Sequence, residues 1–120
     1  MDYRFKATIL KIVDGDTVDC RIRLGFHVEV VERLRLCMSD GVGLNAPETR
    51  GAERESGLAS KVALRNLLAR YTEDDEVIVQ TFRGTAQGKY GRFLGALETS
   101  EGVKICDLLV ENGHAVRKAY

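Results

Sequence analysis

Three short segments of this 120-residue chain carry side chains that could act together on a phosphate. The first is Asp-Gly-Asp-Thr, which holds Asp14 and Asp16, and the second is Asn-Ala-Pro-Glu-Thr, which holds Glu48. The third is Lys-Tyr-Gly-Arg at positions 89–92. Carboxylate oxygens bind hard divalent cations, a further carboxylate can act as a base, and guanidinium groups match phosphate oxygens. Together these groups meet the needs of phosphodiester cleavage.

Each segment alone has an ordinary structural explanation. Asp-Gly is a common hairpin turn, although a second carboxylate two residues away is more than a turn requires and suits a group that orients a metal ligand. Pro47, the single proline, fixes its own φ and pushes Ala46 toward an extended conformation. The Ala46 carbonyl and the Glu48 carboxylate can then point to one place. The combination of segments is therefore more specific than any one of them.

The composition gives the chain no excess of positive charge, so any attraction for nucleic acid must come from a local cluster of basic residues. Lys and Arg together number 18, as do Asp and Glu, so the net charge is zero and gives no overall field. We expect one domain over residues 1–120. The isolated His27 and His114 argue against a histidine metal site or triad.

The cysteines and the apolar runs bear on the class of protein. Cys20, Cys37 and Cys106 are widely spaced, which indicates buried reduced thiols, or one pair and a leftover, rather than a zinc site. No apolar run reaches membrane length, and the first residues are not those of a signal peptide. We expect no membrane partner, a monomer, and a cytoplasmic location if the chain is complete.

Periodicity predicts the elements that must position the three segments. Alternating apolar residues predict strands over 5–13, 18–24 and 27–36, joined by turns at Asp14-Gly15 and Gly25-Phe26. Helical spacing predicts a helix over 53–71 with an apolar stripe of Leu58, Val62, Leu64, Leu67, Leu68 and Tyr71. Strands over 76–83 and 92–98 follow, then a short helix at 105–109 capped by Gly113. This order predicts an α+β, mainly β fold: a five-stranded OB-type barrel with two or three packed helices.

With these motifs in this order, the chain resembles the thermonuclease (staphylococcal nuclease-like) family over nearly its whole length. The matching segments are Asp-Gly-Asp-Thr, Arg-Leu before a loop, Ala-Pro-Glu-Thr, a helix, Lys-Tyr-Gly-Arg and a closing Glu-Asn-Gly-x-Ala. The resemblance implies an OB-fold endonuclease that cuts DNA and RNA with Ca²⁺ and leaves 3′-phosphates. Other divalent ions stay open as the physiological metal.

The resemblance also implies a role for each matching residue. It makes Asp16 a direct metal ligand with Asp14 behind it, and gives the backbone carbonyl of Ala46 to the metal as well. Glu48 would polarise the attacking water, while Arg35 and Arg92 would hold the scissile phosphate. Lys89 and Tyr90 would flank the phosphate or base of a nucleotide.

One position departs from the family pattern. The family has an Asp directly before the Ala-Pro-Glu segment, and this chain has Asn45 there. Counting forward from Arg35 instead places Asp40 at that ligand position, as though about five residues were inserted over 37–44. We favour Asn45 because of its adjacency to Ala46, and its uncharged oxygen predicts weaker binding of calcium. Asp40, folding back from a glycine-containing loop, is the alternative.

Two functions follow from these observations. The first is a metal-dependent endonuclease acting on DNA and RNA. The second is a catalytically weakened OB-type module that binds single-stranded nucleic acid or a protein partner, which the Asn45 substitution and the zero net charge favour. A third hypothesis is a barrel that binds other proteins and whose site is degenerate.

Overall fold

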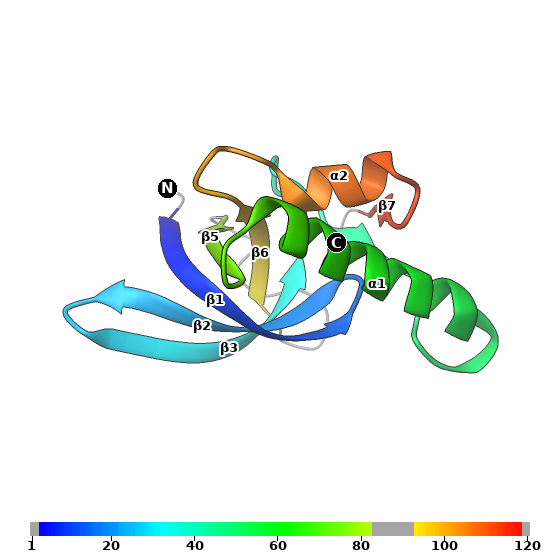
Figure 1. Ribbon diagram of the computed structural model, residues 1–120, viewed down its shortest axis with the longest axis horizontal. Helices are drawn as coiled ribbons and strands as arrows, with labels where there is room; N and C mark the ends of the chain where they lie inside the picture. The colour runs from blue at the N-terminus through cyan, green and yellow to red at the C-terminus, as the bar shows by residue number, and fades with distance from the viewer. Residues whose placement is uncertain (1–2, 83–92, 119–120) are drawn as a thin grey trace.

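The fold is built around a closed barrel of five strands (Figure 1). The structure is a computed structural model, which describes residues 3–82 and 93–118. The strands are β1 (Tyr3–Asp14), β2 (Thr17–Gly25), β3 (Val28–Leu36), β5 (Glu76–Thr81) and β6 (Phe93–Glu98), in the order β1-β2-β3-β6-β5. Neighbours are antiparallel except β3 and β6, which are parallel. This confirms the predicted α+β, mainly β fold with an OB-type barrel.

The long first strand closes the barrel. Its first half pairs with β5 and its second half pairs with β2, with irregularities between Ile9 and Lys11 and between Ile12 and Asp14. Such bulges increase the local twist, which lets one strand bend from one neighbour to the other. The alternation predicted from the sequence places Ala7, Ile9 and Val18 in the core.

Two helices pack together on one side of the barrel (Figure 1). These are α1 (Arg54–Tyr71), preceded by the 3₁₀ turn η1 (Gly51–Glu53), and α2 (Ile105–Glu111). The predicted stripe on α1 was wrong at Leu58 and Val62, which are 37% and 55% exposed. The first turns of α1 instead bury Gly57 and Ser60, because small side chains bring this part of the helix close to its neighbours. No described helix is long and apolar enough to cross a membrane.

The second helix ends at the predicted glycine. Gly113 adopts a φ of 81°, and its N–H donates to the carbonyl of Val110 at 3.0 Å. The N–H of His114 donates to the carbonyl of Leu109, also at 3.0 Å. These two bonds make a Schellman motif, in which a left-handed residue ends the helix. The chain is thereby turned back toward the barrel.

A two-stranded ribbon that the sequence did not predict lies beside the barrel. It consists of β4 (Leu44–Asn45) and β7 (Val116–Arg117), paired antiparallel with Asn45 opposite Val116. The N–H of Lys118 extends the pairing by donating to the carbonyl of Gly43 at 2.7 Å. Strands of two residues are too short to show any periodic pattern.

The three cysteines are free and buried, as predicted. Burial raises the pKa of the Cys20 thiol to about 12 and that of Cys106 to about 12. The pKa of Cys37 is raised for the same reason. These thiols are therefore neutral parts of the core.

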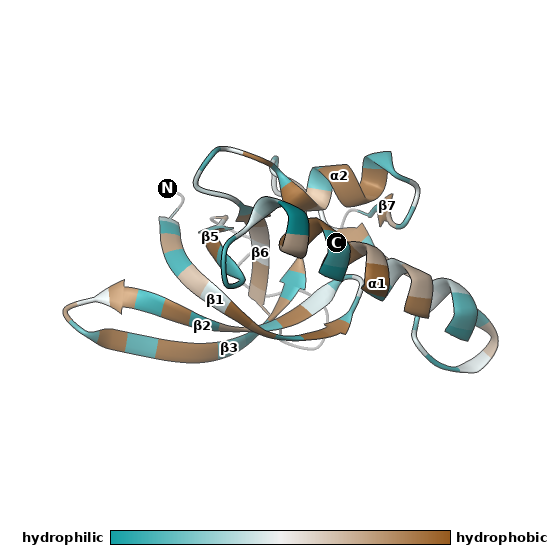
Figure 2. Ribbon diagram, in the orientation of Figure 1, coloured by the Kyte–Doolittle hydropathy of each residue, from teal (hydrophilic) through white to brown (hydrophobic). Residues whose placement is uncertain are grey.

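The hairpin formed by β2 and β3 extends beyond the barrel as an arm, which we define as residues 21–33 (Figure 1). Apolar residues continue along both strands of this arm (Figure 2). Its tip turns through Gly25, Phe26 and His27, all with positive φ. Phe26 is completely exposed there.

Candidate active site

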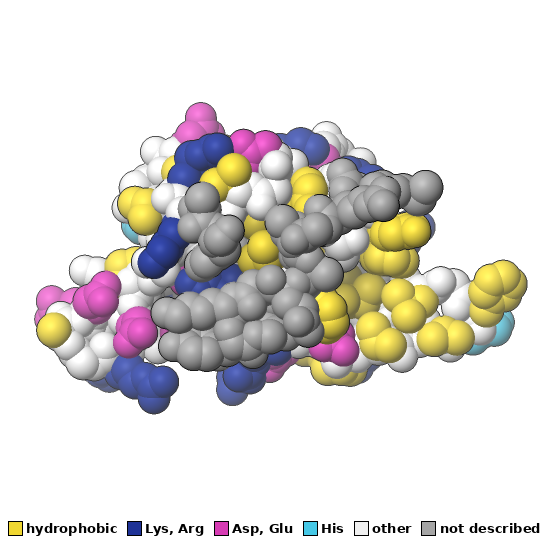
Figure 3. All heavy atoms as spheres, turned by 180° about the vertical axis from the view of Figure 1, so that it is seen from behind, with side chains coloured by type: hydrophobic (Ala, Val, Ile, Leu, Met, Phe, Trp, Pro, Cys, Tyr) yellow, Lys and Arg dark blue, Asp and Glu magenta, His cyan; other side chains and the backbone are white. Residues whose placement is uncertain are grey.

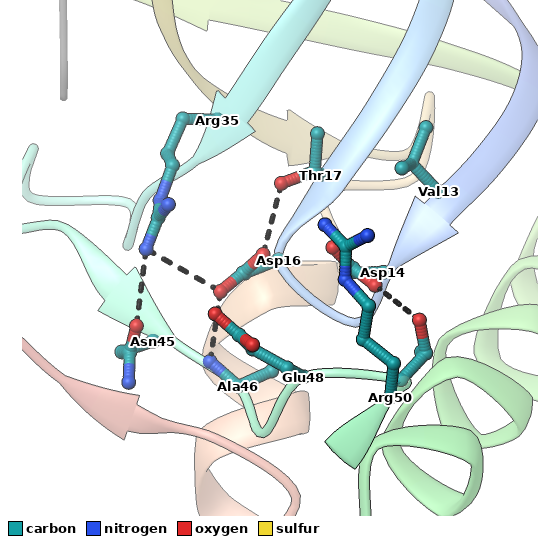
Figure 4. Close-up of a pocket in the computed structure, with 10 residues that line it drawn as sticks. Val13, Asp14, Asp16, Thr17, Arg35, Asn45, Ala46, Glu48 and Arg50 are labelled. Atoms are coloured by element: carbon teal, nitrogen blue, oxygen red, sulfur yellow. Dashed lines mark hydrogen bonds and ion pairs between the residues drawn. The ribbon is translucent and has the colours of Figure 1, made fainter. Parts of the chain in front are cut away.

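A polar pocket of about 520 Å³ lies where β1 turns into β2 (Figure 4). Its lining comes from the β1–β2 turn, from β3, and from the segment that joins β4 to η1. The lining residues are Val13, Asp14, Asp16, Thr17, Arg35, Asn45, Ala46, Glu48, Thr49 and Arg50. Six predicted site residues are thus gathered around one cavity: Asp14, Asp16, Arg35, Asn45, Ala46 and Glu48.

Asp16 is buried at 5% exposure and is held from several directions. Its Oδ1 accepts a hydrogen bond from the Thr17 hydroxyl at 2.9 Å, and its Oδ2 accepts one from the Ala46 N–H at 3.0 Å. The Oδ2 also lies 3.5 Å from Nη2 of Arg35. A carboxylate offers about four acceptor positions, so Oδ1 keeps one direction in which a cation could be bound.

Arg35 reaches the pocket from β3, opposite Thr17. Its Nη2 donates to the side-chain oxygen of Asn45 at 3.0 Å, and the residue is only 9% exposed. Figure 4 shows Asn45 turned toward this guanidinium. The oxygen that was predicted to bind metal is therefore directed at Arg35 in this arrangement.

Glu48 follows the rigid Ala46-Pro47 pair and is exposed to water. In Figure 4 its carboxylate and that of Asp16 point into the same cavity, with the Arg35 guanidinium to one side. Ala46 contributes its N–H to Asp16, in addition to any role of its carbonyl. A carboxylate open to water beside a buried carboxylate suits proton transfer from a water molecule.

Asp14 is tied to the Glu48 segment. Its Oδ1 accepts a hydrogen bond from the hydroxyl of Thr49 at 2.8 Å. This bond connects the end of β1 to the residue directly after Glu48. Asp14 thus helps to position Glu48, in addition to its predicted place behind Asp16.

Four lining residues were not predicted from the sequence. They are Val13, Thr17, Thr49 and Arg50. Each threonine directly follows a predicted acidic residue and bonds to an aspartate, which is the only sequence signal that could have indicated its role. Figure 4 shows Arg50 on the other side of the carboxylates from Arg35, so a second guanidinium flanks the pocket.

Asp40 occupies an exposed turn and is not part of the pocket lining. Its carboxylate accepts the N–H of Val42 at 3.0 Å and a hydrogen bond from Arg117 at 2.8 Å. The Val42 N–H, and then Arg117, hold the pKa of this carboxyl below its usual value. Ser39 fastens the same turn to Asp107 on α2 at 2.6 Å. The structure thus brings Asn45 to the pocket and Asp40 to Arg117.

The first turns of α1 support both acidic segments from behind. A Cβ added to Gly57 would lie 1.9 Å from the carbonyl oxygen of Glu48. A Cβ added to Gly15 would lie 2.1 Å from Oγ of Ser60, whose hydroxyl donates to the His114 carbonyl at 2.7 Å. Only glycine permits these approaches. The relative placement of Asp16 and Glu48 is therefore fixed by one helix.

The donors of the pocket fit a hard divalent cation in kind. They are carboxylate, amide and carbonyl oxygens, which Ca²⁺ and Mg²⁺ prefer. Within residues 3–82 and 93–118, no group of three or more His, Cys, Asp or Glu side chains is placed to hold a metal. Of the predicted ligands Asp16, Asn45 and Ala46, Asp16 alone is charged, and the Asn45 oxygen is already directed at Arg35. A cation would therefore be bound weakly here, since affinity follows the charge of the ligands.

Comparisons with known proteins do not identify a family for this chain. No protein-family model matches this chain, and no curated protein matches it in sequence. The predicted residues Lys89, Tyr90 and Arg92 lie outside the described residues. Inference about function thus depends on the geometry of the pocket.

Proposed function

We propose that this protein is an endonuclease that hydrolyses phosphodiester bonds of DNA and RNA with a divalent cation, Ca²⁺ in the first place. The observation that carries the proposal is the convergence of Asp16, Arg35 and Glu48, from three separate segments, on one polar pocket. Asp16 and Arg35 also pair with each other at 3.5 Å, whereas Glu48 is exposed to water. A phosphate ligand, a base and a cation ligand are the groups that phosphodiester hydrolysis uses.

Each side chain has a distinct task in this proposal. Arg35 binds a phosphate oxygen and stabilises negative charge as it develops. Glu48 accepts a proton from the attacking water, and its exposure lets that water reach it. Asp16 and Ala46 would hold the cation, which would neutralise charge on the phosphate. The family resemblance adds Arg92 as a second phosphate ligand and a 3′-phosphate as the product.

A second function is favoured by the bond between Arg35 and Asn45. Because Asn45 carries no charge, the pocket attracts a cation less strongly than it would with an aspartate at this position. Arg35 and Arg50, which both line the pocket, can still bind phosphate. The chain would then hold single-stranded nucleic acid without cutting it. Salt-dependent binding with no metal requirement is the expected behaviour of such a module.

Cleavage of fluorescent single-stranded DNA and RNA by the purified chain tests the proposal. We expect cutting with Ca²⁺, little or none with chelator, and a loss of about 10²-fold or more in Glu48→Gln, since a general base contributes that much. Glu53→Gln is the matched control, because Glu53 is an exposed acid in η1 outside the pocket lining.

Two results would contradict the proposal. Equal rates for Glu48→Gln and the unaltered chain would remove Glu48 from the mechanism. A folded chain that binds the oligonucleotides, yet cuts none with any divalent ion, would establish the binding module instead.

A further inference from the structure

The arm presents two chemically different faces. Ile22, Leu24, Val28 and Val30 share the parity of the core residues, and the outer members of this face are exposed. Figure 3, seen from behind, shows hydrophobic side chains gathered at that end of the molecule. The other face of β1, β2 and β3 carries a different set of side chains, dominated by basic groups.

Strand register defines the basic face. Residues directly opposite each other in a ladder point to the same side of the sheet, and Thr8 lies opposite Arg21, Lys11 opposite Asp19, and Thr17 opposite Arg35. The cations that share this side are Arg4, Lys6, Lys11, Arg21, Arg23, Arg33 and Arg35, and they outnumber the acids Asp14, Asp19, Glu29, Glu76 and Glu98. This side is therefore positive, although the whole chain has zero net charge.

Some of these cations are paired and others are not. Arg33 makes two bonds to Asp19, at 2.7 and 3.1 Å, and Arg23 pairs with Glu76 at 2.8 Å. Within the part of the chain that the structure describes, no salt bridge includes Lys6, Lys11 or Arg21, and all three are exposed. Lys6 and Arg21 are available to an anion, and so is Lys11, although it also acts electrostatically on Asp19, which lies opposite it.

The basic face begins at the pocket. Arg33 and Arg35 are two residues apart on the same side of β3, so their Cα atoms are separated by about 6.6 Å. This spacing is comparable to that of successive phosphates in an extended nucleic acid strand. From Arg35 the face continues past Arg21 and Arg23 toward the tip of the arm.

The tip offers a platform for a base. Phe26 is fully exposed, and both Phe26 and His27 have positive φ values, of 53° and 64°. Two-residue hairpin turns with positive φ favour Asn-Gly, and other residues adopt this conformation at an energetic cost. Strained backbone often marks a functional site, so a strained turn that exposes an aromatic ring to solvent indicates a function for that ring. Exposed aromatic rings stack on nucleic acid bases.

We propose that the arm, together with Lys11 of β1 next to its base, is a nucleic acid track, along which a single strand leaves the pocket with its phosphates on Lys11 and Arg21 and a base stacked on Phe26. The partner is a polyanion with exposed bases, which is single-stranded DNA or RNA rather than a duplex or a protein. This inference rests on the proposed function, because it takes its direction from the pocket.

Binding of oligonucleotides in the presence of chelator tests the track without any cleavage. We expect affinity to rise with the length of the strand, and Lys11→Ala with Arg21→Ala to lower the slope of log affinity against log salt by about 0.7 for each cation. Phe26→Ala should weaken binding by about tenfold, the effect of losing one stacked base. Arg54→Ala is the matched control, since Arg54 is exposed at the start of α1.

Cleavage of a dinucleotide, which fills the pocket alone, separates this inference from the proposed function. The arm variants should cut the dinucleotide at the unaltered rate and cut long strands with a raised KM. Binding that depends on the arm in a chain that never cuts would support the track and overturn the nuclease. Cleavage and binding that are equal in all arm variants, for every strand length, would overturn the track and leave the nuclease standing. Equal affinity for duplex and single strand would also overturn it.

Discussion

Asn45 decides how much negative charge the pocket offers to a cation. Its amide oxygen accepts a hydrogen bond from Arg35, and its backbone is fixed by pairing with Val116. The residue thus occupies the position that the family resemblance assigns to a metal ligand, but it contributes no charge. In the proposed function, this side chain therefore sets how strongly the pocket binds a cation.

At the residue scale we predict that Asn45→Asp strengthens cation binding. A second carboxylate beside Asp16 adds a charged ligand, and we expect the dissociation constant for Ca²⁺ to fall by about tenfold. Titration with Ca²⁺ by calorimetry measures it. Asn66→Asp is the control, because it makes the same change on the exposed side of α1. Equal gains in both variants would mean that the effect is one of general charge.

Residues that act within one short motif could be predicted from the sequence, and those joined across the fold could not. Asp16 and Glu48 were found because each stands in a recognisable segment. The bond from Thr49 to Asp14 joins positions 35 residues apart, which no local pattern indicates. The pairing of Asp40 with Arg117 is likewise a tertiary contact, so spacing alone left Asp40 and Asn45 as alternatives.

At the scale of elements, α1 is the support on which the pocket is assembled. Gly57 lies against the Glu48 backbone, and Ser60 lies against Gly15. The helix was predicted almost to its ends, but its buried face was not. Leucine periodicity pointed to Leu58 and Val62, while close packing of small residues determined the face that is actually buried. A pattern of apolar residues does not indicate a contact that is made through glycine.

We predict that Gly57→Ala destabilises the protein and slows cleavage. In an ordinary helix this change stabilises by about 1 kcal/mol, but here the added Cβ would lie 1.9 Å from the Glu48 carbonyl oxygen. We expect a net loss of about 1–3 kcal/mol, typical of overpacking, and a fall in kcat because Glu48 is displaced. Urea unfolding and cleavage kinetics measure the two effects.

Ala59→Gly provides the comparison on the exposed side of the same helix. It should cost about 1 kcal/mol through helix propensity alone, with kcat unchanged. A gain in stability for Gly57→Ala would contradict the close approach of helix and loop.

At the scale of the whole molecule, one buried core joins the barrel to both helices. Cys20 lies in the barrel wall and Cys106 in α2, and both are part of this core. Their neutral thiols couple the stability of the entire fold to alkaline pH. Glu98 adds a partly buried ionic link, pairing with Arg4 from β1 and with Lys104 before α2.

We predict that stability declines above about pH 9. The pKa of Cys20 is raised to about 12 in the folded chain from 9.0. Stability from the neutral thiol is therefore fully present below pH 9 and is lost as the pH rises toward 12. Urea midpoints at increasing pH measure this decline, and Cys20→Ala should show a shallower one. Identical pH profiles for the two proteins would contradict the raised pKa.

The ribbon of β4 and β7 joins an early part of the sequence to a late one, which affects when the pocket can be assembled during synthesis. Asn45 enters the pocket early in the sequence, yet its backbone partner is Val116. A nascent chain on the ribosome is made from its N-terminus, so the acids, the arginine and most of the barrel exist before that partner does. The pairing that positions Asn45 can therefore form only after residue 117 has emerged, when the strands of the barrel and both helices have already been synthesised.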